Sequence, residues 1–439
     1  MNFDETLRYL LSLGHETVTM KLGLRNVEIL LAALGEPQQT FPSIQIAGTN
    51  GKGSTAVVLE SILRHAGIRT GLYTSPHLVS ITERIRIDGT EISTADFSRL
   101  ASAVRTTAEA LVQAHRLETV PTFFEQTTAI AFLAFKEAKL DLAILETGLG
   151  GRLDATTCAA AQTVAITPVA LDHEEYLGNT IQEIAAEKAA IIRPGVTAII
   201  GQQSPLARDV ILRRCEQKNV TPIFDETVKR IDSFSFDGRF CVTFETPVDT
   251  YEKLQLGLRG RHQIINVSLA IAIAESLRSQ GYLIPKVAIV DGVENARHAG
   301  RLELLPAAPA ILLDGAHNPA GAESLKAYLE EFAPESLTLV FGAMRDKKVD
   351  QMIELLFPLA DRVVLWELNN PRAASLEVLQ ELARNQTKPD QIVSVRSAEE
   401  AIAAARSITP LPGMICFTGS LYLVGASREL LLAENAAGV

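Results

Sequence analysis

A glycine-rich loop that contains a lysine is the stretch of this sequence best suited to chemistry. The loop combines glycines, a lysine and two hydroxyl side chains, in the order Gly48, Gly51, Lys52, Gly53, Ser54 and Thr55. Glycines let backbone N–H groups approach phosphate oxygens, the lysine adds a mobile positive charge, and hydroxyls can reach a magnesium ion. The pattern predicts a phosphate-binding loop, although Gly53 separates Lys52 from Ser54, unlike the common phosphate-loop motif. The alternative is a glycine turn that only joins a strand to a helix.

The elements on either side of this loop support the first interpretation. The apolar run 44–47 predicts a buried strand, and apolar residues at helical spacing over 56–63 predict a helix that ends at Gly67. A strand, a glycine turn and a helix start together present N–H groups and a positive helix end to an anion. The sequence therefore predicts a phosphate site at the start of this helix.

Polar residues follow three further predicted strands, namely Ser75, Glu146 and His173. Because ligands bind at the carboxyl ends of parallel strands, we expect these side chains to lie near Lys52. Hydroxyl and carboxylate oxygens suit magnesium beside nucleotide phosphates, whereas imidazole suits softer metals. Each residue also has a structural alternative: a turn former before Pro76, a capped carboxylate, and a hydrogen-bonded histidine, respectively.

Two more segments carry polar residues that could do chemistry. Lys188 lies in the predicted helix 181–192 among small apolar residues, where a solvated lysine is the alternative. A later strand end precedes a helix start at which Asn318 and Pro319 fit the cap and the first position. The helix start does not explain Asp314 and His317 in the same segment.

Strands and helices alternate through the first part of the chain, which predicts a parallel sheet covered by helices. Helices are expected within 1–42. The other expected strands are 69–73, 141–146, 163–167 and 196–201, and the other expected helices are 96–115, 123–138, 181–192 and 259–277. Apolar residues within 220–256 alternate instead and predict an antiparallel appendage. We expect one phosphate-loop, nucleotide-binding domain over 1–297 that includes this appendage.

The alternation restarts in the second part of the chain. The expected strands are 310–314, 337–341, 362–366, 391–395 and 414–417, and the expected helices are 320–332, 349–357, 375–383 and 398–405. This arrangement predicts a smaller, doubly wound, Rossmann-like domain over 298–439. The fold class is therefore α/β.

Composition excludes several classes of function. The net charge of -11 argues against a nucleic-acid surface, which needs clustered lysine and arginine. The four cysteines lie far apart and form no CxxC pair, which fits a reducing compartment. No signal pattern or membrane-spanning apolar run is seen. We therefore expect a cytoplasmic protein that binds neither nucleic acid nor membrane. We also predict small-molecule substrates and a monomer, neither of which composition decides.

Several motifs, in order along the chain, resemble the folylpolyglutamate synthase/dihydrofolate synthase family. This family is a branch of the Mur-ligase superfamily of ATP-dependent amide-forming enzymes. The matching motifs are residues 48–54, 74–78, 146–155, 171–173, 187–188 and 314–319. The blocks 146–155 and 314–319 are typical of the folate branch, and the resemblance runs from about residue 7 to residue 425.

The resemblance implies sites for ATP and for two magnesium ions. The residues that would contact ATP are Gly51, Lys52, Gly53, Ser54, Asn266, Arg301 and Asp314. Ser75 and Glu146 would bind one magnesium ion, and Glu146 with His173 would bind the second. Lys188 would be carbamylated, so that its carbamate oxygens support the second metal through water.

The resemblance also implies sites for the organic substrates. The residues on the pterin side would be Thr122, Phe123, Phe124, Glu125, Leu153, Asp154 and Ala155. Arg84, His317 and Ser420 would receive the incoming glutamate. Lys52, Lys188 and His317 are the implied catalytic residues.

The implied reaction joins L-glutamate to a folate carboxylate. Transfer of the γ-phosphoryl group of ATP makes an acyl phosphate, which the glutamate amine then attacks. The acceptor would be a tetrahydrofolate-type folate, dihydropteroate, or both, and folylpolyglutamate synthase activity alone is the first alternative. A non-catalytic nucleotide switch is a more distant alternative. A cell-wall precursor ligase would need a further domain before the phosphate loop, which begins at Gly48.

Overall fold

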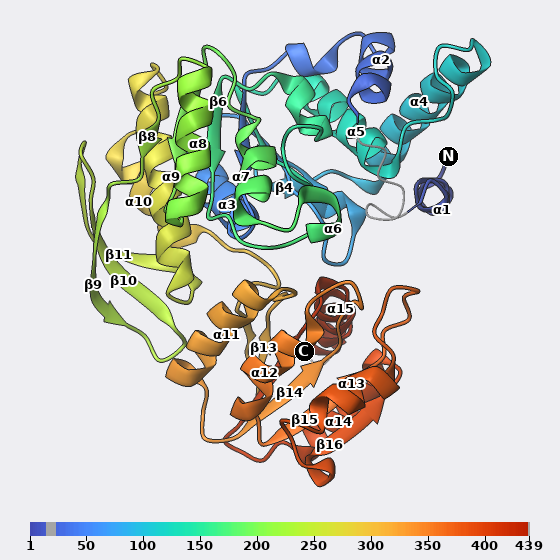
Figure 1. Ribbon diagram of the computed structural model, residues 1–439, viewed down its shortest axis with the longest axis vertical. Coiled ribbons are helices and arrows are strands. Elements are labelled where there is room, and N and C mark those ends of the chain that lie inside the picture. The colour runs from blue at the N-terminus through green and yellow to red at the C-terminus, as the bar shows by residue number, and fades with distance from the viewer. Residues whose placement is uncertain (15–22, 438–439) are drawn as a thin grey trace. The chain divides into compact units, whose positions relative to one another are not determined.

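The computed structural model of the chain describes residues 1–14 and 23–437 and contains two compact units (Figure 1). Unit 1 comprises residues 1–228, 244–251 and 265–296, and unit 2 comprises residues 229–243, 252–264 and 297–439. The two units therefore interleave along the chain between residues 228 and 297. The domain limits expected from the sequence, 1–297 and 298–439, stay a prediction.

The described part of unit 1 is built on an eight-stranded sheet in the order β4-β3-β2-β5-β1-β6-β7-β8. Its parallel strands are β1 (Ser43–Ala47), β2 (Thr70–Tyr73), β5 (Leu142–Glu146), β6 (Thr163–Ile166), β7 (Thr197–Ile200) and β8 (Ile223–Phe224). Two short antiparallel strands, β3 (Ile85–Ile87) and β4 (Thr90–Glu91), complete one edge. Strand β1 lies between β5 and β6, so the glycine loop leaves the centre of the sheet.

Helices cover this sheet because its central strands are apolar on both faces. They are α1 (Phe3–Ser12), α2 (Arg25–Ala33), α3 (Lys52–His65), α4 (Thr94–Gln113), α5 (Phe123–Ala138), α6 (Glu174–Leu177), α7 (Ile181–Ala189), α8 (Pro205–Gln217), α9 (His262–Ser279) and α10 (Lys286–Asn295). Helix α3 is buried from Ser54 to Leu63, and α10 packs closely against it. Gly292 allows this approach, because a Cβ atom there would overlap the backbone of Ile62. The helix that follows the glycine loop is thus firmly held.

A three-stranded sheet in the order β11-β10-β9 follows the parallel sheet along the chain. Its strands are β9 (Val228–Phe234), β10 (Arg239–Glu245) and β11 (Thr250–Arg259). The connections over 235–238 and 246–249 are short, so neighbouring strands run antiparallel. The appendage expected at 220–256 therefore begins later than expected, because β8 (Ile223–Phe224) pairs parallel with β7 in the large sheet, and it ends three residues later.

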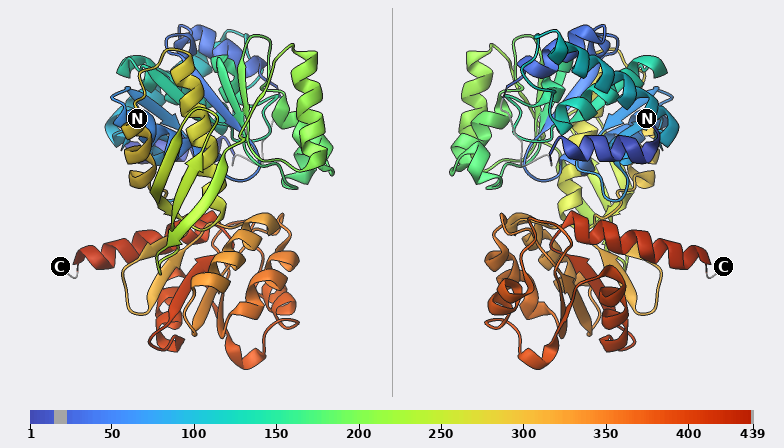
Figure 2. Two further views of the ribbon diagram at one scale, coloured as in Figure 1. Left: turned by 90° about the vertical axis from the view of Figure 1, so that its left-hand side faces the viewer. Right: turned by 90° about the vertical axis from the view of Figure 1, so that its right-hand side faces the viewer.

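Unit 2 contains, in its described residues, a six-stranded sheet in the order β12-β13-β17-β14-β15-β16. Figure 2 shows this sheet in orange to red. Strand β12 (Glu303–Leu305) is antiparallel to β13 (Ala310–Leu313), while β14 (Leu337–Phe341), β15 (Arg362–Trp366), β16 (Ile392–Val395) and β17 (Met414–Thr418) run parallel to β13. The helices are α11 (Pro319–Phe332), α12 (Val349–Leu356), α13 (Leu376–Ala383), α14 (Ala398–Ile408) and α15 (Leu421–Ala437).

The helices of unit 2 cover both faces of its sheet. Helix α12 packs on α11 and α13, and α14 packs on α15. The chain moves in one direction from β13 to β16 and then returns to β17 between β13 and β14. Right-handed crossovers place the connecting helices of the two directions on opposite faces, as in a doubly wound sheet. This places the loops after β13 and β17 side by side.

The expected α/β fold class is confirmed. The expected strands and helices are present, but helices α6, α8, α10 and α15 and strands β3, β4 and β12 were not expected. Part of the helical expectation for residues 1–42 falls on 15–22, which lie outside the described residues. Among the described helices, none is long and apolar enough to cross a membrane.

Candidate active site

The glycine loop has a conformation that requires two of its glycines. Gly51 has φ 87° and caps the N-terminus of α3. A Cβ atom on Gly51 would overlap the side-chain amide of Asn266, and one on Gly48 would overlap the side chain of Thr167. Only glycine therefore permits this close packing of the loop against α9 and the end of β6.

Hydrogen bonds fix the loop against the segment that follows β6. The N–H groups of Thr49 and Asn50 donate to Pro168 O at 3.0 and 3.3 Å. The Thr49 hydroxyl donates to Ala170 O and accepts from Ala170 N, both at 3.0 Å. Thr55 N donates to Gly51 O at 2.8 Å, at the first turn of α3. The first N–H groups of an α-helix point away from the helix body and are available to a ligand. The helix start is thus suited to bind an anion.

Lys188 of α7 is buried beside this loop. Its side chain is 4% exposed, and Nζ donates to Gly48 O at 2.7 Å. Burial, followed by the positive charge of Lys52, lowers the pKa of Lys188 to about 7, while Asp172 and Asp154 act in the opposite direction. The alternative of a solvated helix lysine is therefore wrong.

The 146–155 loop brings α7 to this position. A Cβ atom on Gly151 would lie 3.0 Å from Lys188 O and 3.1 Å from Glu187 O, so the loop backbone packs directly on the helix. Arg152 N also donates to Glu187 O at 3.0 Å. The glycines of this loop thus place the Lys188 amine against the glycine loop.

Ser75 and Glu146 meet at the ends of the neighbouring strands β2 and β5. The Glu146 side chain is 5% exposed, and its Oε2 accepts from Ser75 N at 3.2 Å. His173 lies after β6 with φ 51°, and its Nε2 is 3.9 Å from Asp172 Oδ2. The structure thus joins two of the three predicted magnesium ligands directly and places the third after the strand on the other side of β1.

These residues fit a magnesium ion held with substrate phosphates. The described residues contain no group of three or more histidine, cysteine, aspartate or glutamate side chains arranged to hold a metal. Magnesium beside a nucleotide needs only one or two carboxylates, because phosphate and water oxygens supply the other ligands. Glu146 and the Ser75 hydroxyl are oxygen donors of that kind.

Asp154 shapes the 146–155 loop from within. Its Oδ2 accepts from the N–H groups of Gly148 and Leu149 at 2.8 and 3.1 Å, and its Oδ1 accepts from Thr156 N at 3.0 Å and from the Thr156 hydroxyl. Burial raises the pKa of Asp154, while the bonds to Thr156, Leu149 and Gly148 oppose this rise. Both carboxylate oxygens thus hold the loop together.

The two segments predicted for the pterin side lie together. Thr122 caps α5, and Glu125 Oε2 accepts from Thr122 N at 2.7 Å. A Cβ atom on Gly148 would lie 2.6 Å from two ring atoms of Phe124, so α5 and the 146–155 loop are in contact. The remaining predicted residues of these segments are Phe123 and Ala155, which are buried, and Leu153, which is partly buried.

Arg84 lies close to this region. Its guanidinium carbon lies 5.3 Å from the centre of the Phe123 ring, and its Nε donates to His77 Nδ1 at 2.8 Å. Burial, followed by the Arg84 charge, lowers the pKa of His77 to about 3. Sequence reasoning gave His77 no role, although the residue lies in the 74–78 motif.

In unit 2, the loop after β13 gathers three predicted residues. Asp314 accepts from Leu302 N at 2.9 Å and from Ala316 N at 3.0 Å, and Arg301 Nη1 donates to Gly315 O at 3.1 Å. Burial raises the pKa of Asp314, and the Arg301 charge opposes this rise. His317 Nδ1 lies 2.8 Å from Gly315 O. This loop therefore holds Arg301, Asp314 and His317 in one cluster.

Ser420 follows β17, next to the same loop. Gly419 N donates to Ala316 O at 3.1 Å, and the Ser420 side chain is 2% exposed. A further member of this region, His262, was missed because it lies at the start of a helix far away in sequence. Burial, followed by the Arg301 charge, lowers the pKa of His262 to about 4.

Comparison with protein families identifies the class to which this fold and these loops belong. The Mur ligase middle domain matches residues 46–274, and the Mur ligase glutamate ligase domain matches residues 300–421. The dihydrofolate synthase/folylpolyglutamate synthase of Bacillus subtilis (strain 168) is 34% identical over 427 residues, covering 94% of this chain and 95% of the relative. The chain therefore belongs to the folylpolyglutamate synthase/dihydrofolate synthase family, and the resemblance seen in the sequence is confirmed.

Solved structures agree with this placement. Mycobacterium tuberculosis folylpolyglutamate synthase complexed with ADP has a TM-score of 0.90 and 32% identity, covering 98% of each chain. The Escherichia coli FolC structure in complex with DHPP and ADP has a TM-score of 0.87 and 31% identity, covering 99% of each chain. The similarity thus extends over the whole described fold.

Proposed function

We propose that this protein is an ATP-dependent ligase that adds L-glutamate to tetrahydrofolate-type folates and to dihydropteroate. The observation that carries the proposal is the buried Lys188 amine on Gly48 of the glycine loop, next to the strand that ends in Glu146. The relatives named for both synthase activities, and the similar structures that hold ADP, support it. ATP is the co-substrate in this proposal.

The reaction activates a carboxylate that is otherwise a poor acylating agent. A carboxylate oxygen of the folate or pteroate attacks the γ-phosphorus of ATP, the bond to the β–γ bridging oxygen breaks, and ADP leaves. The glutamate amine then attacks the carbonyl carbon of the acyl phosphate. The carbon–oxygen bond to phosphate breaks, the amine loses a proton, and the amide and inorganic phosphate are released.

The glycine loop binds the ATP phosphates in this proposal. Gly51, Lys52, Gly53 and Ser54 supply backbone N–H groups, a positive charge and a hydroxyl at the start of α3. Lys52 Nζ donates to Thr49 O at 3.3 Å, which holds its charge at the loop. Asn266 packs on Gly51. We propose that Asn266, Arg301 and Asp314 contact ATP.

Two magnesium ions, when bound, neutralise the charge that develops on the transferring phosphoryl group. Ser75 and Glu146 would hold one ion, and Glu146 with His173 would hold the other. The lowered pKa of Lys188 supports carbamylation, because carbon dioxide adds to a neutral amine with loss of a proton. The carbamate oxygens of Lys188 would then support the second ion through water.

The organic substrates use the neighbouring segments. The partly buried Phe124 offers an aromatic face to a pterin ring, and the buried Phe123 lies beneath this site against Arg84. Thr122 and Glu125 fix the helix start, and Asp154 fixes the loop that carries Leu153 and Ala155. Arg84, His317 and Ser420 receive the incoming glutamate. Lys52, Lys188 and His317 are the proposed catalytic residues.

The remaining parts of the proposal concern the setting of the reaction. We propose a cytoplasmic monomer that acts on small molecules and binds neither membrane nor nucleic acid. The net charge of -11 supports the proposal that the protein does not bind nucleic acid.

A coupled assay of ADP release tests the proposal. ADP release that requires both glutamate and a folate acceptor supports the ligase. ADP release when dihydropteroate takes the place of the folate supports the second activity. Turnover with tetrahydrofolate but not with dihydropteroate would leave folylpolyglutamate synthase alone. ADP release that ignores both substrates, or no release at all, would count against a ligase and favour a nucleotide switch.

A further inference from the structure

Arg84 is held by a histidine whose protonated nitrogen can be deduced from geometry. The Arg84 side chain is 2% exposed, and Arg84 Nε lies 2.8 Å from His77 Nδ1. A guanidinium has only N–H donors, so Nδ1 must be the acceptor. The proton of the neutral imidazole therefore resides on Nε2. His77 thus occupies the Nε edge of Arg84.

A second contact restrains the position of the guanidinium. The Arg84 carbon Cζ lies 5.3 Å from the centre of the Phe123 ring, at the first residue of α5. The aromatic face and the His77 nitrogen restrain the guanidinium in different directions. Bidentate pairing with a carboxylate requires such a fixed orientation, because both N–H···O bonds must form in one plane.

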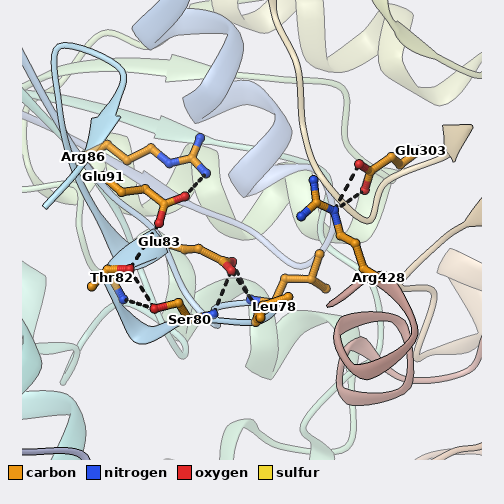
Figure 3. Close-up of polar contacts among 9 residues, drawn as sticks. Leu78, Ser80, Thr82, Glu83, Arg86, Glu91, Glu303 and Arg428 are labelled. Atoms are coloured by element: carbon orange, nitrogen blue, oxygen red, sulfur yellow. Dashed lines mark hydrogen bonds and ion pairs between the residues drawn. The ribbon is translucent and has the colours of Figure 1, made fainter. Parts of the chain in front are cut away.

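The loop that carries His77 and Arg84 is held by the carboxylate of Glu83, which lies in the same loop (Figure 3). Glu83 Oε2 accepts from Leu78 N at 2.7 Å, and Glu83 Oε1 accepts from Val79 N and Ser80 N, both at 2.8 Å. Thr74 N donates to Arg84 O at 3.0 Å, which closes the loop between β2 and β3. His77 and Arg84 therefore have defined positions relative to each other.

We propose that His77 is a positioning residue that orients Arg84 to receive a carboxylate of the incoming amino acid. This inference rests on the proposed function, in which Arg84 contacts glutamate. His77 acts through the guanidinium and not on the reacting atoms. Loss of the Nδ1 acceptor therefore weakens glutamate binding and leaves ATP binding as it was.

Steady-state kinetics with matched variants test this role. His77→Leu removes the acceptor, and His77→Asn keeps an acceptor oxygen near the place of Nδ1. We expect His77→Leu to raise KM for glutamate about 10- to 100-fold, the range for a hydrogen bond to a charged group, with KM for ATP unchanged. His77→Asn recovers most of the loss. His65→Leu is the control, because His65 is exposed and its Nδ1 bonds to Ser61 O at 2.7 Å.

The outcomes separate this inference from the function on which it rests. An Arg84→Ala variant with unchanged KM for glutamate would remove Arg84 from the glutamate site and refute the proposed role of Arg84. A raised KM in Arg84→Ala with an unchanged KM in His77→Leu would overturn the role of His77 alone. Equal rises of KM for glutamate and ATP in His77→Leu would show a merely structural residue.

A measurement on the unmutated protein gives a second test. Nitrogen-15 NMR of labelled histidines distinguishes a protonated from an unprotonated Nδ1, and the His77 signal is identified by its absence in His77→Asn. We expect His77 to carry its proton on Nε2, whereas His65 carries it on Nδ1, since its partner is a carbonyl oxygen. A proton on Nδ1 of His77 would overturn the inference, and this test needs only that His77→Asn folds, not that it is active.

Discussion

Replacement of Lys188 by methionine tests the chemistry of the glycine-loop site. The lysine is 4% exposed, and Nζ donates to Gly48 O at 2.7 Å. Methionine keeps an unbranched apolar side chain in the buried space and removes only the amine. The change therefore isolates the nitrogen from the packing of α7.

The magnitude follows from the pKa of Lys188, which is about 7 instead of the usual 10.5. At pH 8 about nine-tenths of such an amine is neutral, against less than about 1% of an ordinary lysine. Only the neutral form adds carbon dioxide. We expect Lys188→Met to lower kcat about 10- to 100-fold, the usual effect of losing a group that supports a metal ligand through its outer shell. Added bicarbonate should not restore the activity.

The same pKa predicts how stability depends on pH. Between pH 7 and pH 10.5 the unfolded chain binds more protons at this lysine than the folded chain does, so the free energy of unfolding rises with pH. Below pH 7 Lys188 is protonated in both the folded and the unfolded state, so the folded state bears the full free-energy cost of a buried charge. The free energy of unfolding of Lys188→Met minus that of the unmutated protein should fall by about 2 kcal/mol between pH 7 and pH 9.

Two measurements check these expectations. ADP release coupled to glutamate and folate gives kcat, and denaturant unfolding in carbonate-free buffer at pH 7 and pH 9 gives the stability difference. Lys388→Met is the control, because Lys388 is exposed and its replacement should change neither quantity. Near-native turnover of Lys188→Met would refute the carbamate role. A stability difference that does not change between pH 7 and pH 9 would refute the lowered pKa of the buried amine.

Two further substitutions test the neighbouring residues. Glu146→Gln keeps an acceptor for Ser75 N and removes the negative charge, so the magnesium concentration for half-maximal rate should rise at least about tenfold; an unchanged magnesium titration would remove Glu146 from the metal site. Gly148→Ala pushes a methyl group against Phe124, so KM for the folate acceptor should rise and stability should fall by about 1–3 kcal/mol. Among the described residues, a Cβ atom on Gly23 meets no atom within 4 Å, so Gly23→Ala should be neutral; equal effects of the two alanines would contradict the steric argument.

Local sequence patterns were sufficient to predict the sites at strand ends. The strand, glycine turn and helix around Lys52 are contiguous, so their geometry follows from short-range rules. Ser75 and Glu146 could be expected together, because each follows a strand of one parallel sheet. Residue types and spacing therefore predicted where the glycine loop and the Glu146 carboxylate lie in the sheet, while their ligands stay a proposal.

Tertiary packing determines what the sequence could not show. Lys188 is buried because Gly151 lets the 146–155 loop pack on α7, and no local pattern reveals that contact. His77 and Arg84 lie seven positions apart in an irregular loop, so no helical or strand period predicts their hydrogen bond. The short strand β12 was missed because three residues carry too little periodicity.

The central claim is that this chain joins glutamate to a folate with ATP. Mass spectrometry of the product formed from tetrahydrofolate and nitrogen-15 glutamate tests it most directly. The account predicts a folate heavier by one labelled glutamate residue for each ADP released. Release of ADP without a heavier folate, or a heavier folate without ADP, would contradict it.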